Sequence, residues 1–132
     1  MWGEFSEAWC YEQLRRVRWP RGITCPFCGG IRVTTHSKPA GTPRRRYLCL
    51  RCRRTFTDLT GTPLARTNLP LGKWFLCLRL LRHGETTTDL ARALGVKWDT
   101  AVQLQRRLGV ALARPGLLRQ LRETMERGEQ HL

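Results

Sequence analysis

Two Cys-x-x-Cys pairs constrain the fold of this chain more than any other feature of its sequence. Cys25 and Cys28 form the first pair, and Cys49 and Cys52 form the second, at a separation that would fit a small β-hairpin. This spacing is typical of a zinc site, in which two tight turns present four thiolates to one metal ion. Four thiolates leave no open coordination position. We therefore expect one structural Zn²⁺ that supports the fold and performs no chemistry.

Disulfide bonds, or four unrelated core thiols, are the alternatives to a zinc site. Doubled Cys-x-x-Cys turns are more often a metal site than a disulfide framework in a chain with no sign of export, and the N-terminus lacks a signal pattern. A thioredoxin-like redox pair would need one such motif beside a βαβ pattern, which the sequence lacks. The remaining cysteines, Cys10 and Cys77, fall on apolar faces of expected helices and are interpreted as core thiols.

The charge balance points to a polyanionic partner. The 132 residues carry a formal net charge of +14 and a pI near 11.1, and zinc bound by four thiolates would lower the charge to about +12. Such a field attracts nucleic acid first and an anionic membrane second. No apolar run approaches the length of a membrane span, so we expect a cytoplasmic, nucleoid-associated protein with no membrane contact.

The sequence predicts a small α+β protein in three parts. Residues 1–62 should hold an N-terminal helix and the zinc ribbon, residues 63–114 a helix-turn-helix, and residues 115–132 a C-terminal helix or tail. A chain this short buries a limited core, so its folding should depend on the metal.

The first part combines a helix with three short strands. Residues 5–18 have helical periodicity, with Cys10 and Leu14 on one face, and residues 31–36, 44–48 and 56–59 have strand character. Together with the two cysteine turns, these segments predict a three-stranded zinc ribbon. Three basic residues lie near the hairpin tip, Arg44, Arg45 and Arg46. They either contact DNA phosphates or form a solvated run of charge.

The second part has the pattern of a helix-turn-helix. An apolar stripe predicts a core helix over 71–82, a capping box at Thr86 begins a short helix, and Gly95 turns the chain into a longer helix from about Trp98. An ordinary three-helix bundle without a partner is the alternative. If the motif binds DNA, the start of its second helix enters the major groove. The outward residues expected to contact DNA are Lys97, Trp98, Thr100, Gln103, Arg106 and Arg107.

Several motifs in one order resemble a known family. The runs RWPRGITCPFC, YLCLRC, TGT, LPLGKWF and LARALGV together resemble the zinc-ribbon plus helix-turn-helix N-terminal region of DDE-type insertion-sequence transposases, over roughly residues 5–110. The resemblance implies binding of terminal inverted repeats, with the four paired cysteines as zinc ligands and the helix from Trp98 as the reader.

The sequence departs from that family in two respects. Lys97 stands where the family typically has a small capping residue, and Asp99 lies where a basic residue is common, so the DNA sequence recognised is expected to differ. The family's strand-transfer chemistry requires three carboxylates on an RNase H-like fold. This chain has ten acidic residues, several of them on expected exposed helix faces. We therefore expect no enzymatic activity.

These observations predict a zinc-dependent double-stranded DNA-binding protein that acts as a transcription regulator or as a DNA-targeting subunit. The alternative is a protein-interaction module that docks on a larger nucleoprotein complex, such as a polymerase or a separate catalytic subunit. The last helix, with Leu117, Leu118, Leu121 and Met125, could pack on the bundle, pair with a second copy or dock a partner. RNA binding is less expected, because no aromatic strip lies on a predicted strand face.

Overall fold

The computed structural model describes residues 5–38, 40–65, 69–82, 84, 86–113 and 116–130, without the side chains of 82 and 126–130. The chain divides into two compact units. We call residues 7–67 the ribbon unit, and residues 68–132 with residues 1–6 the helical unit. The predicted small α+β fold is confirmed: an N-terminal helix and a three-stranded antiparallel sheet precede four helices. No helix in the described ranges is long and apolar enough to cross a membrane.

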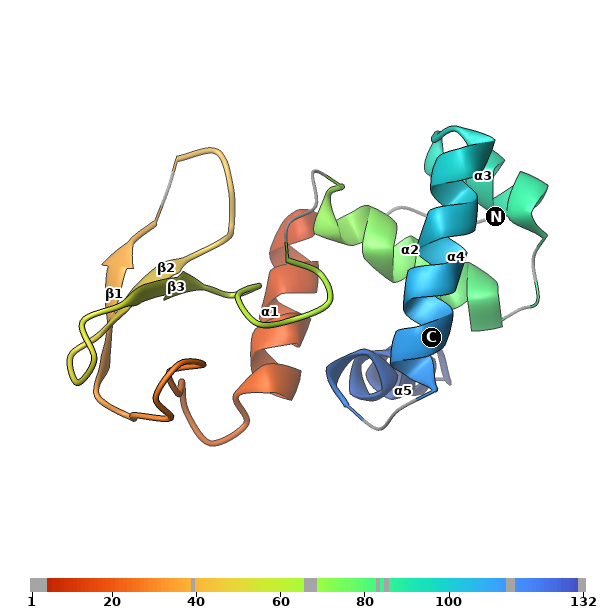
Figure 1. Ribbon diagram of the computed structural model, residues 1–132. Coiled ribbons are helices and arrows are strands. Elements are labelled where there is room, and N and C mark those ends of the chain that lie inside the picture. Colours follow the sequence, from red (N-terminus) through yellow and green to blue (C-terminus); the bar gives the residue numbers. More distant parts are fainter. Residues whose placement is uncertain are drawn as a thin grey trace. The chain divides into compact units, whose positions relative to one another are not determined.

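The ribbon unit contains α1 (Glu7–Arg18), β1 (Val33–Ser37), β2 (Arg46–Cys49) and β3 (Thr55–Thr57). The strands are antiparallel in the order β1-β2-β3, and α1 lies beside the sheet (Figure 1). The first strand begins two residues later than the sequence predicted, because Ile31 belongs to the turn in which its carbonyl accepts from the Val33 N–H. The third strand ends at Thr57, since the next residue leaves the sheet for a polar cluster.

Aromatic residues and cysteines share the core of the sheet. Trp19, Tyr47 and Phe56 pack edge to face or tilted, with ring centroids 5.3 to 6.3 Å apart, and Cys25 and Cys49 are buried beside them. Only a few large side chains are buried here, so the apolar contribution of the sheet to stability is modest. The α1 helix adds its own buried face, which comprises the predicted Cys10 and Leu14 and also Tyr11.

Asp58 joins the sheet, the hairpin loop and α1. Its carboxylate is fully buried and accepts a two-pronged bond from the Arg15 guanidinium at 3.1 and 2.8 Å, a 2.6 Å bond from the Tyr47 hydroxyl and a 2.9 Å bond from the Arg45 N–H. Arg15 also donates to the Pro43 carbonyl. A buried carboxylate is tolerated only when its oxygens are paired in this way. These contacts fix the chain on either side of the hairpin arginines.

The helical unit contains α2 (Leu71–Arg82), α3 (Thr87–Leu94), α4 (Trp98–Leu112) and α5 (Leu117–Gln130). The predicted apolar stripe of α2 comprises Leu71, Trp74, Phe75, Leu78 and Leu81. The first four are buried and Leu81 is half-buried. Burial extends further, to Leu76, Cys77 and Leu80. This helix therefore lies at the centre of its unit, and α5 lies at the C-terminal end of α4 (Figure 1).

The α3 helix has the expected chemistry at both of its ends. The Thr86 hydroxyl accepts from the Asp89 N–H, which is the N-cap half of a capping box, and it donates to the Asp89 carboxylate. At the other end Gly95 adopts a left-handed conformation with φ of 68°, and the Val96 N–H donates to the Ala91 carbonyl. This Schellman arrangement stops α3 cleanly and redirects the chain into α4.

Basic side chains satisfy carbonyls at two helix ends. The Lys73 ammonium on α2 donates to the Leu94 carbonyl at 2.6 Å, and the Arg119 guanidinium on α5 donates to the Leu112 carbonyl at 3.0 Å. Cations at helix C-termini also interact favourably with the helix dipole. These contacts tie α3 to α2, and α4 to α5.

Candidate metal centre and nucleic-acid interface

The four paired cysteines converge on one point of the ribbon unit. The sulfurs of Cys25, Cys28, Cys49 and Cys52 all lie within 4.8 Å of one another. Cys25 Sγ lies 3.7 Å from Cys52 Sγ, and Cys28 Sγ lies 3.6 Å from Cys49 Sγ. Zinc–sulfur bonds of about 2.3 Å place the sulfurs of a tetrahedral site about 3.8 Å apart. The spacing therefore fits a single tetrahedral ion.

The two cysteine turns repeat the same backbone conformation. The Gly29 N–H donates to the Cys25 carbonyl at 2.9 Å, and the Arg53 N–H donates to the Cys49 carbonyl at the same distance. Gly29 has φ of 74° and Arg53 has φ of 65°. A glycine after the second cysteine is a sequence signal for such a conformation, whereas an arginine gives no such signal. We call these two turns the knuckles.

Backbone amides point at the sulfurs, as a thiolate centre requires. The Phe27 N–H lies 3.4 Å from Cys25 Sγ, the Gly30 N–H lies 3.3 Å from Cys28 Sγ, and the Cys52 N–H lies 3.5 Å from Cys49 Sγ. The bond from Cys52 is the largest of the influences that lower the pKa of the Cys49 thiol to about 6. The pKa of the neighbouring Cys28 thiol is raised to about 11, so without a metal the proton of this sulfur pair stays on Cys28. Thiolates are the form that binds zinc.

A side chain at Gly30 would disturb the centre. A Cβ atom built there would lie 3.2 Å from Cys28 Sγ and 3.4 Å from the Arg51 side chain. Because the sulfur must keep its position relative to the metal, it has little freedom to move away. The space around the sulfur therefore favours glycine at position 30. At position 29 glycine is favoured by the left-handed backbone, which Arg53 adopts in the second knuckle despite its side chain.

The other two cysteines are separate from the centre and lie in apolar cores. Cys10 and Cys77 are fully buried, and burial raises the pKa of each thiol to about 12. The acidic Glu7 contributes further to the shift at Cys10. Both thiols remain protonated at neutral pH. The interpretation of these residues as core thiols agrees with their burial.

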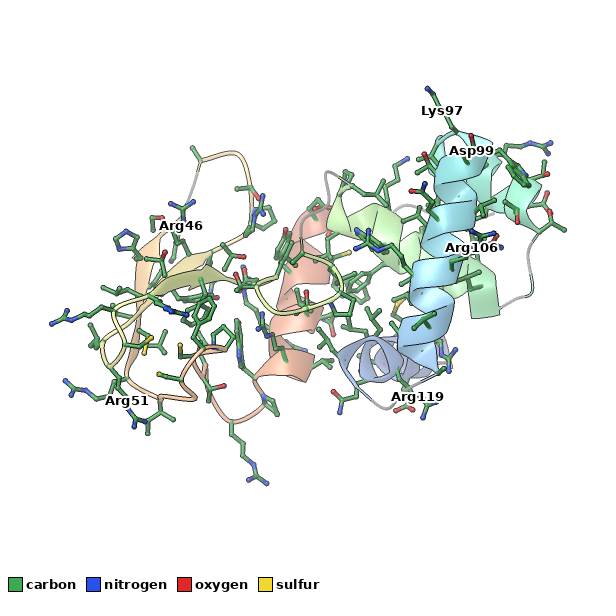
Figure 2. All side chains as sticks on the ribbon, in the orientation of Figure 1. Arg46, Arg51, Lys97, Asp99, Arg106 and Arg119 are labelled. Carbon is green, nitrogen blue, oxygen red and sulfur yellow. The ribbon has the colours of Figure 1, made fainter. Side chains whose placement is uncertain are left out.

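The hairpin arginines lie at the start of β2 and just before it. Arg44, Arg45 and Arg46 are exposed, and the first two line a hollow of about 520 Å³ together with Lys38 and Arg16. Figure 2 shows Arg46 extending from the sheet. Cations around an open hollow can accommodate an anionic group.

The buried and the exposed residues of α4 lie in separate rows along the helix. Ala101, Leu104, Leu108 and Leu112 are buried. Every α4 residue predicted to contact DNA is exposed, as is Lys97 just before the helix; these are Lys97, Trp98, Thr100, Gln103, Arg106 and Arg107. Figure 2 shows Lys97 and Asp99 at the beginning of the helix and Arg106 further along it.

The structure adds detail at two of these residues. Lys97 takes the N-cap position of α4 with extended backbone angles and makes no side-chain capping bond, so the first amides of the helix are left uncapped by a side chain. Arg107 lies over the Trp74 ring, 5.7 Å from its centroid. Its guanidinium is thus held toward α2 rather than along the row that contains Gln103 and Arg106.

Comparison with known proteins finds a match for the first part of the chain. Residues 5–55 match the transposase zinc-ribbon domain of the IS1595 type. This match covers α1, the four cysteines and the sheet up to the start of β3, and it stops before the helical unit. The ribbon unit is therefore similar to a transposase zinc ribbon, and the four clustered cysteines fit one structural zinc.

A curated relative supports the same assignment over a longer stretch. The chain is 33% identical over 113 residues to an uncharacterized protein in transposable element ISH50 of Halobacterium salinarum. The matched region covers 83% of this chain and 37% of that protein. No solved structure matches the chain. The resemblance to insertion-sequence proteins that the motifs indicated is thereby confirmed.

Proposed function

From the premise that the ribbon unit is similar to a transposase zinc ribbon, we propose that the chain is a zinc-dependent double-stranded DNA-binding protein without catalytic activity. Cys25, Cys28, Cys49 and Cys52 hold one structural zinc, and α3 and α4 act as a helix-turn-helix. The observation that carries the proposal is the exposed row at the start of α4, which leaves polar and basic side chains available opposite a buried apolar row.

The exposed row has the chemistry needed to read base edges. Gln103 can bond to both the N6 and N7 positions of adenine, and Arg106 can bond to O6 and N7 of guanine. Asp99 can accept from a cytosine amine at the same helix face. All three side chains are exposed on successive turns of α4. A groove-bound helix would bring them to adjacent base pairs.

The ribbon unit supplies the positive charge for phosphate contacts. Residues 13–57 contain eleven arginines and one lysine and no acidic residue. Arg44, Arg45 and Arg46 are exposed at the hairpin, where Asp58 fixes the chain beside them. In this proposal these arginines neutralise phosphates and orient the protein, while α4 determines sequence preference.

The proposed biological role is that of a transcription regulator or a DNA-targeting subunit in a larger assembly. A protein-interaction module is the second candidate, with α5 as the contact. The buried Leu118, Leu121 and Met125 already serve the helical unit, so a partner or second copy would have to use the polar side of α5. This makes DNA the better-supported partner.

Two measurements test the proposal. DNA sequences selected from a random duplex pool should be bound with an affinity that falls steeply as salt increases, because each phosphate contact contributes about −0.9 to the slope of log affinity on log salt. Replacing Gln103 by alanine should weaken binding to the selected sequence by about 1–3 kcal/mol.

The matched control is Gln120→Ala, which removes an exposed glutamine from α5. This control should bind the selected DNA as tightly as the parent chain. A flat salt response would exclude DNA binding. Equal affinities for the Gln103 and Gln120 variants would exclude α4 as the reader.

A further inference from the structure

Three apolar side chains on or beside the knuckles are exposed to solvent. Phe27 and Leu50 occupy the middle of the two turns and are 48% and 36% exposed, and Ile31 is 80% exposed. The knuckles need no apolar side chain at these positions to bind zinc, since only the sulfurs and the backbone amides face the metal. Their exposure therefore needs another explanation.

The backbone brings these side chains onto one end of the ribbon. The Leu50 N–H donates to the Arg32 carbonyl at 2.8 Å, which places the second knuckle against the chain that follows Ile31. The Arg54 guanidinium lies 5.0 Å from the centroid of the Phe27 ring, so it joins the first knuckle to the second. The two turns thus form one continuous surface.

Arginines alternate with the apolar side chains on this surface. We define the knuckle surface as Phe27, Ile31 and Leu50 together with Arg32, Arg51, Arg53 and Arg54, all of which are exposed. Figure 2 shows Arg51 extending away from the ribbon. A zinc ion with four thiolates carries a net charge of about −2, which four arginines exceed. The surface therefore remains cationic when the metal is bound.

We infer that the knuckle surface is a second duplex-DNA contact, which binds the minor groove and inserts Phe27 and Ile31 against the bases. This inference rests on the proposed DNA-binding function. Proteins that bind the minor groove combine arginines with apolar wedges such as phenylalanine, leucine and isoleucine, which partly unstack a base step. The knuckle surface presents both kinds of side chain together.

The arrangement fits DNA better than a protein partner. Protein interfaces have an apolar centre depleted of charge and a polar rim. On the knuckle surface Ile31 is followed directly by Arg32, Leu50 by Arg51, and Phe27 lies beneath Arg54, so no charge-free apolar centre exists among these residues. Alternating cations and wedges match a groove bordered by phosphates.

The metal makes insertion of these side chains less costly. The sulfurs on either side of Phe27 and of Leu50 are held by one ion, and each knuckle is closed by a 2.9 Å backbone bond. A wedge on a rigid turn loses less conformational freedom on binding than one on an unrestrained loop. The hairpin end of the ribbon, with Arg44 and Arg45 around its hollow, has no comparable exposed apolar group among its described lining residues.

Fluorescence of a modified duplex tests this inference with the zinc-loaded chain. The probe is a duplex of alternating A·T and T·A pairs in which 2-aminopurine replaces one adenine in each helical turn, because T-A steps unstack easily. Binding of the parent chain should increase the fluorescence. The double variant Phe27→Ser, Ile31→Ser should bind about tenfold more weakly and lose most of the increase. Prior addition of netropsin, which occupies the minor groove, should also abolish the increase.

Two comparisons keep the result interpretable. Trp9→Ser makes the same kind of change at an exposed aromatic residue of α1 and should retain the parent signal. Ile31→Ser alone alters a side chain with little buried area, so it tests the wedge without endangering the fold. Zinc content and melting temperature verify folding of each variant.

The outcomes separate this inference from the proposed function. If the parent chain fails to bind any duplex, both fail. If the parent binds with a steep salt dependence but the Phe27 and Ile31 variants match Trp9→Ser in affinity and fluorescence, only the minor-groove contact is excluded. The exposed apolar side chains would then fit an acidic protein segment instead.

Discussion

The ribbon unit and the helical unit reach stability by different means. In the ribbon unit three strands of three to five residues enclose a small aromatic core, and a cluster of four sulfurs and a buried Asp58 provide the remaining cohesion. The helical unit buries leucines from four helices around α2 and needs no metal ligand among its described side chains. Short strands cannot bury enough apolar surface on their own, whereas stacked helices can. The two units should therefore respond differently to the same perturbation.

Removal of zinc should produce the largest difference between them. A structural zinc site contributes on the order of 10 kcal/mol to folding, which exceeds what the small sheet core can supply. A strong chelator, or the substitution Cys49→Ser, should unfold the ribbon unit and leave the helical unit folded. The indole NMR signal of Trp19 should collapse toward random-coil values while that of Trp74 keeps its dispersion. Loss of both signals, or retention of both, would show that the two units do not differ in their dependence on zinc.

Loss of the Asp58 carboxylate should be the next largest effect. Asp58→Ala leaves the mostly buried Arg15 guanidinium without its partner and should cost about 3–5 kcal/mol in the free energy of unfolding of the ribbon unit. Urea titration followed at the Trp19 signal measures this cost. Glu12→Ala, which breaks the exposed pair with Arg16, should change stability by less than about 1 kcal/mol. Equal effects of the two substitutions would show that Asp58 is not a structural centre.

A core truncation in α4 should affect only the helical unit. Leu108 is 1% exposed, so Leu108→Ala should reduce stability by about 2–5 kcal/mol through lost burial and a cavity. Urea unfolding followed by circular dichroism gives the change, and the zinc content should stay at one ion per chain. Val110→Ala on the exposed side of the same helix should change stability by about 0.5 kcal/mol or less. Zinc loss in the Leu108 variant would mean that the units are not independent.

The capping bond of α3 should give the smallest effect. Thr86→Ala removes the hydroxyl that accepts from the Asp89 N–H and should cost about 1 kcal/mol. Thr88→Ala, at an exposed position inside the first turn, removes a β-branched residue and should be neutral or slightly stabilising. Hydrogen exchange of the α3 amides resolves such differences. The same sign and size for both substitutions would exclude a specific role for the cap.

Local patterns made much of this molecule predictable from its sequence. The cysteine spacing predicted the metal cluster, the apolar stripe predicted α2, and Thr86 and Gly95 predicted the ends of α3. The stripe and the helix ends depend on residues a few positions apart. The metal cluster joins two distant pairs, but each pair is a local Cys-x-x-Cys motif and their separation is typical of a zinc site. The expected exposure along α4 followed from the same helical periodicity.

Features that depend on distant residues were not predictable. Asp58 appeared to be an ordinary strand-end residue, yet its partner Arg15 lies forty-three positions earlier in the chain. The left-handed Arg53 was missed because its conformation is imposed by the second knuckle and not by its own preference. The knuckle surface was also missed, because Ile31 was assigned to a strand, whereas it lies in a turn.

The contrast between the clustered and the buried cysteines makes thiol chemistry a direct reporter of metal occupancy. Cys10 and Cys77 are enclosed and protonated, so an alkylating reagent should leave them unmodified while the chain is folded. The other four sulfurs should be shielded by a bound ion and should react once it is withdrawn. Cys10 should react with them, because it lies in the ribbon unit that unfolds without zinc, whereas Cys77 in the folded helical unit should not. Mass spectrometry of the intact chain should then register additions in steps up to five, a count that distinguishes loaded from empty molecules in any preparation.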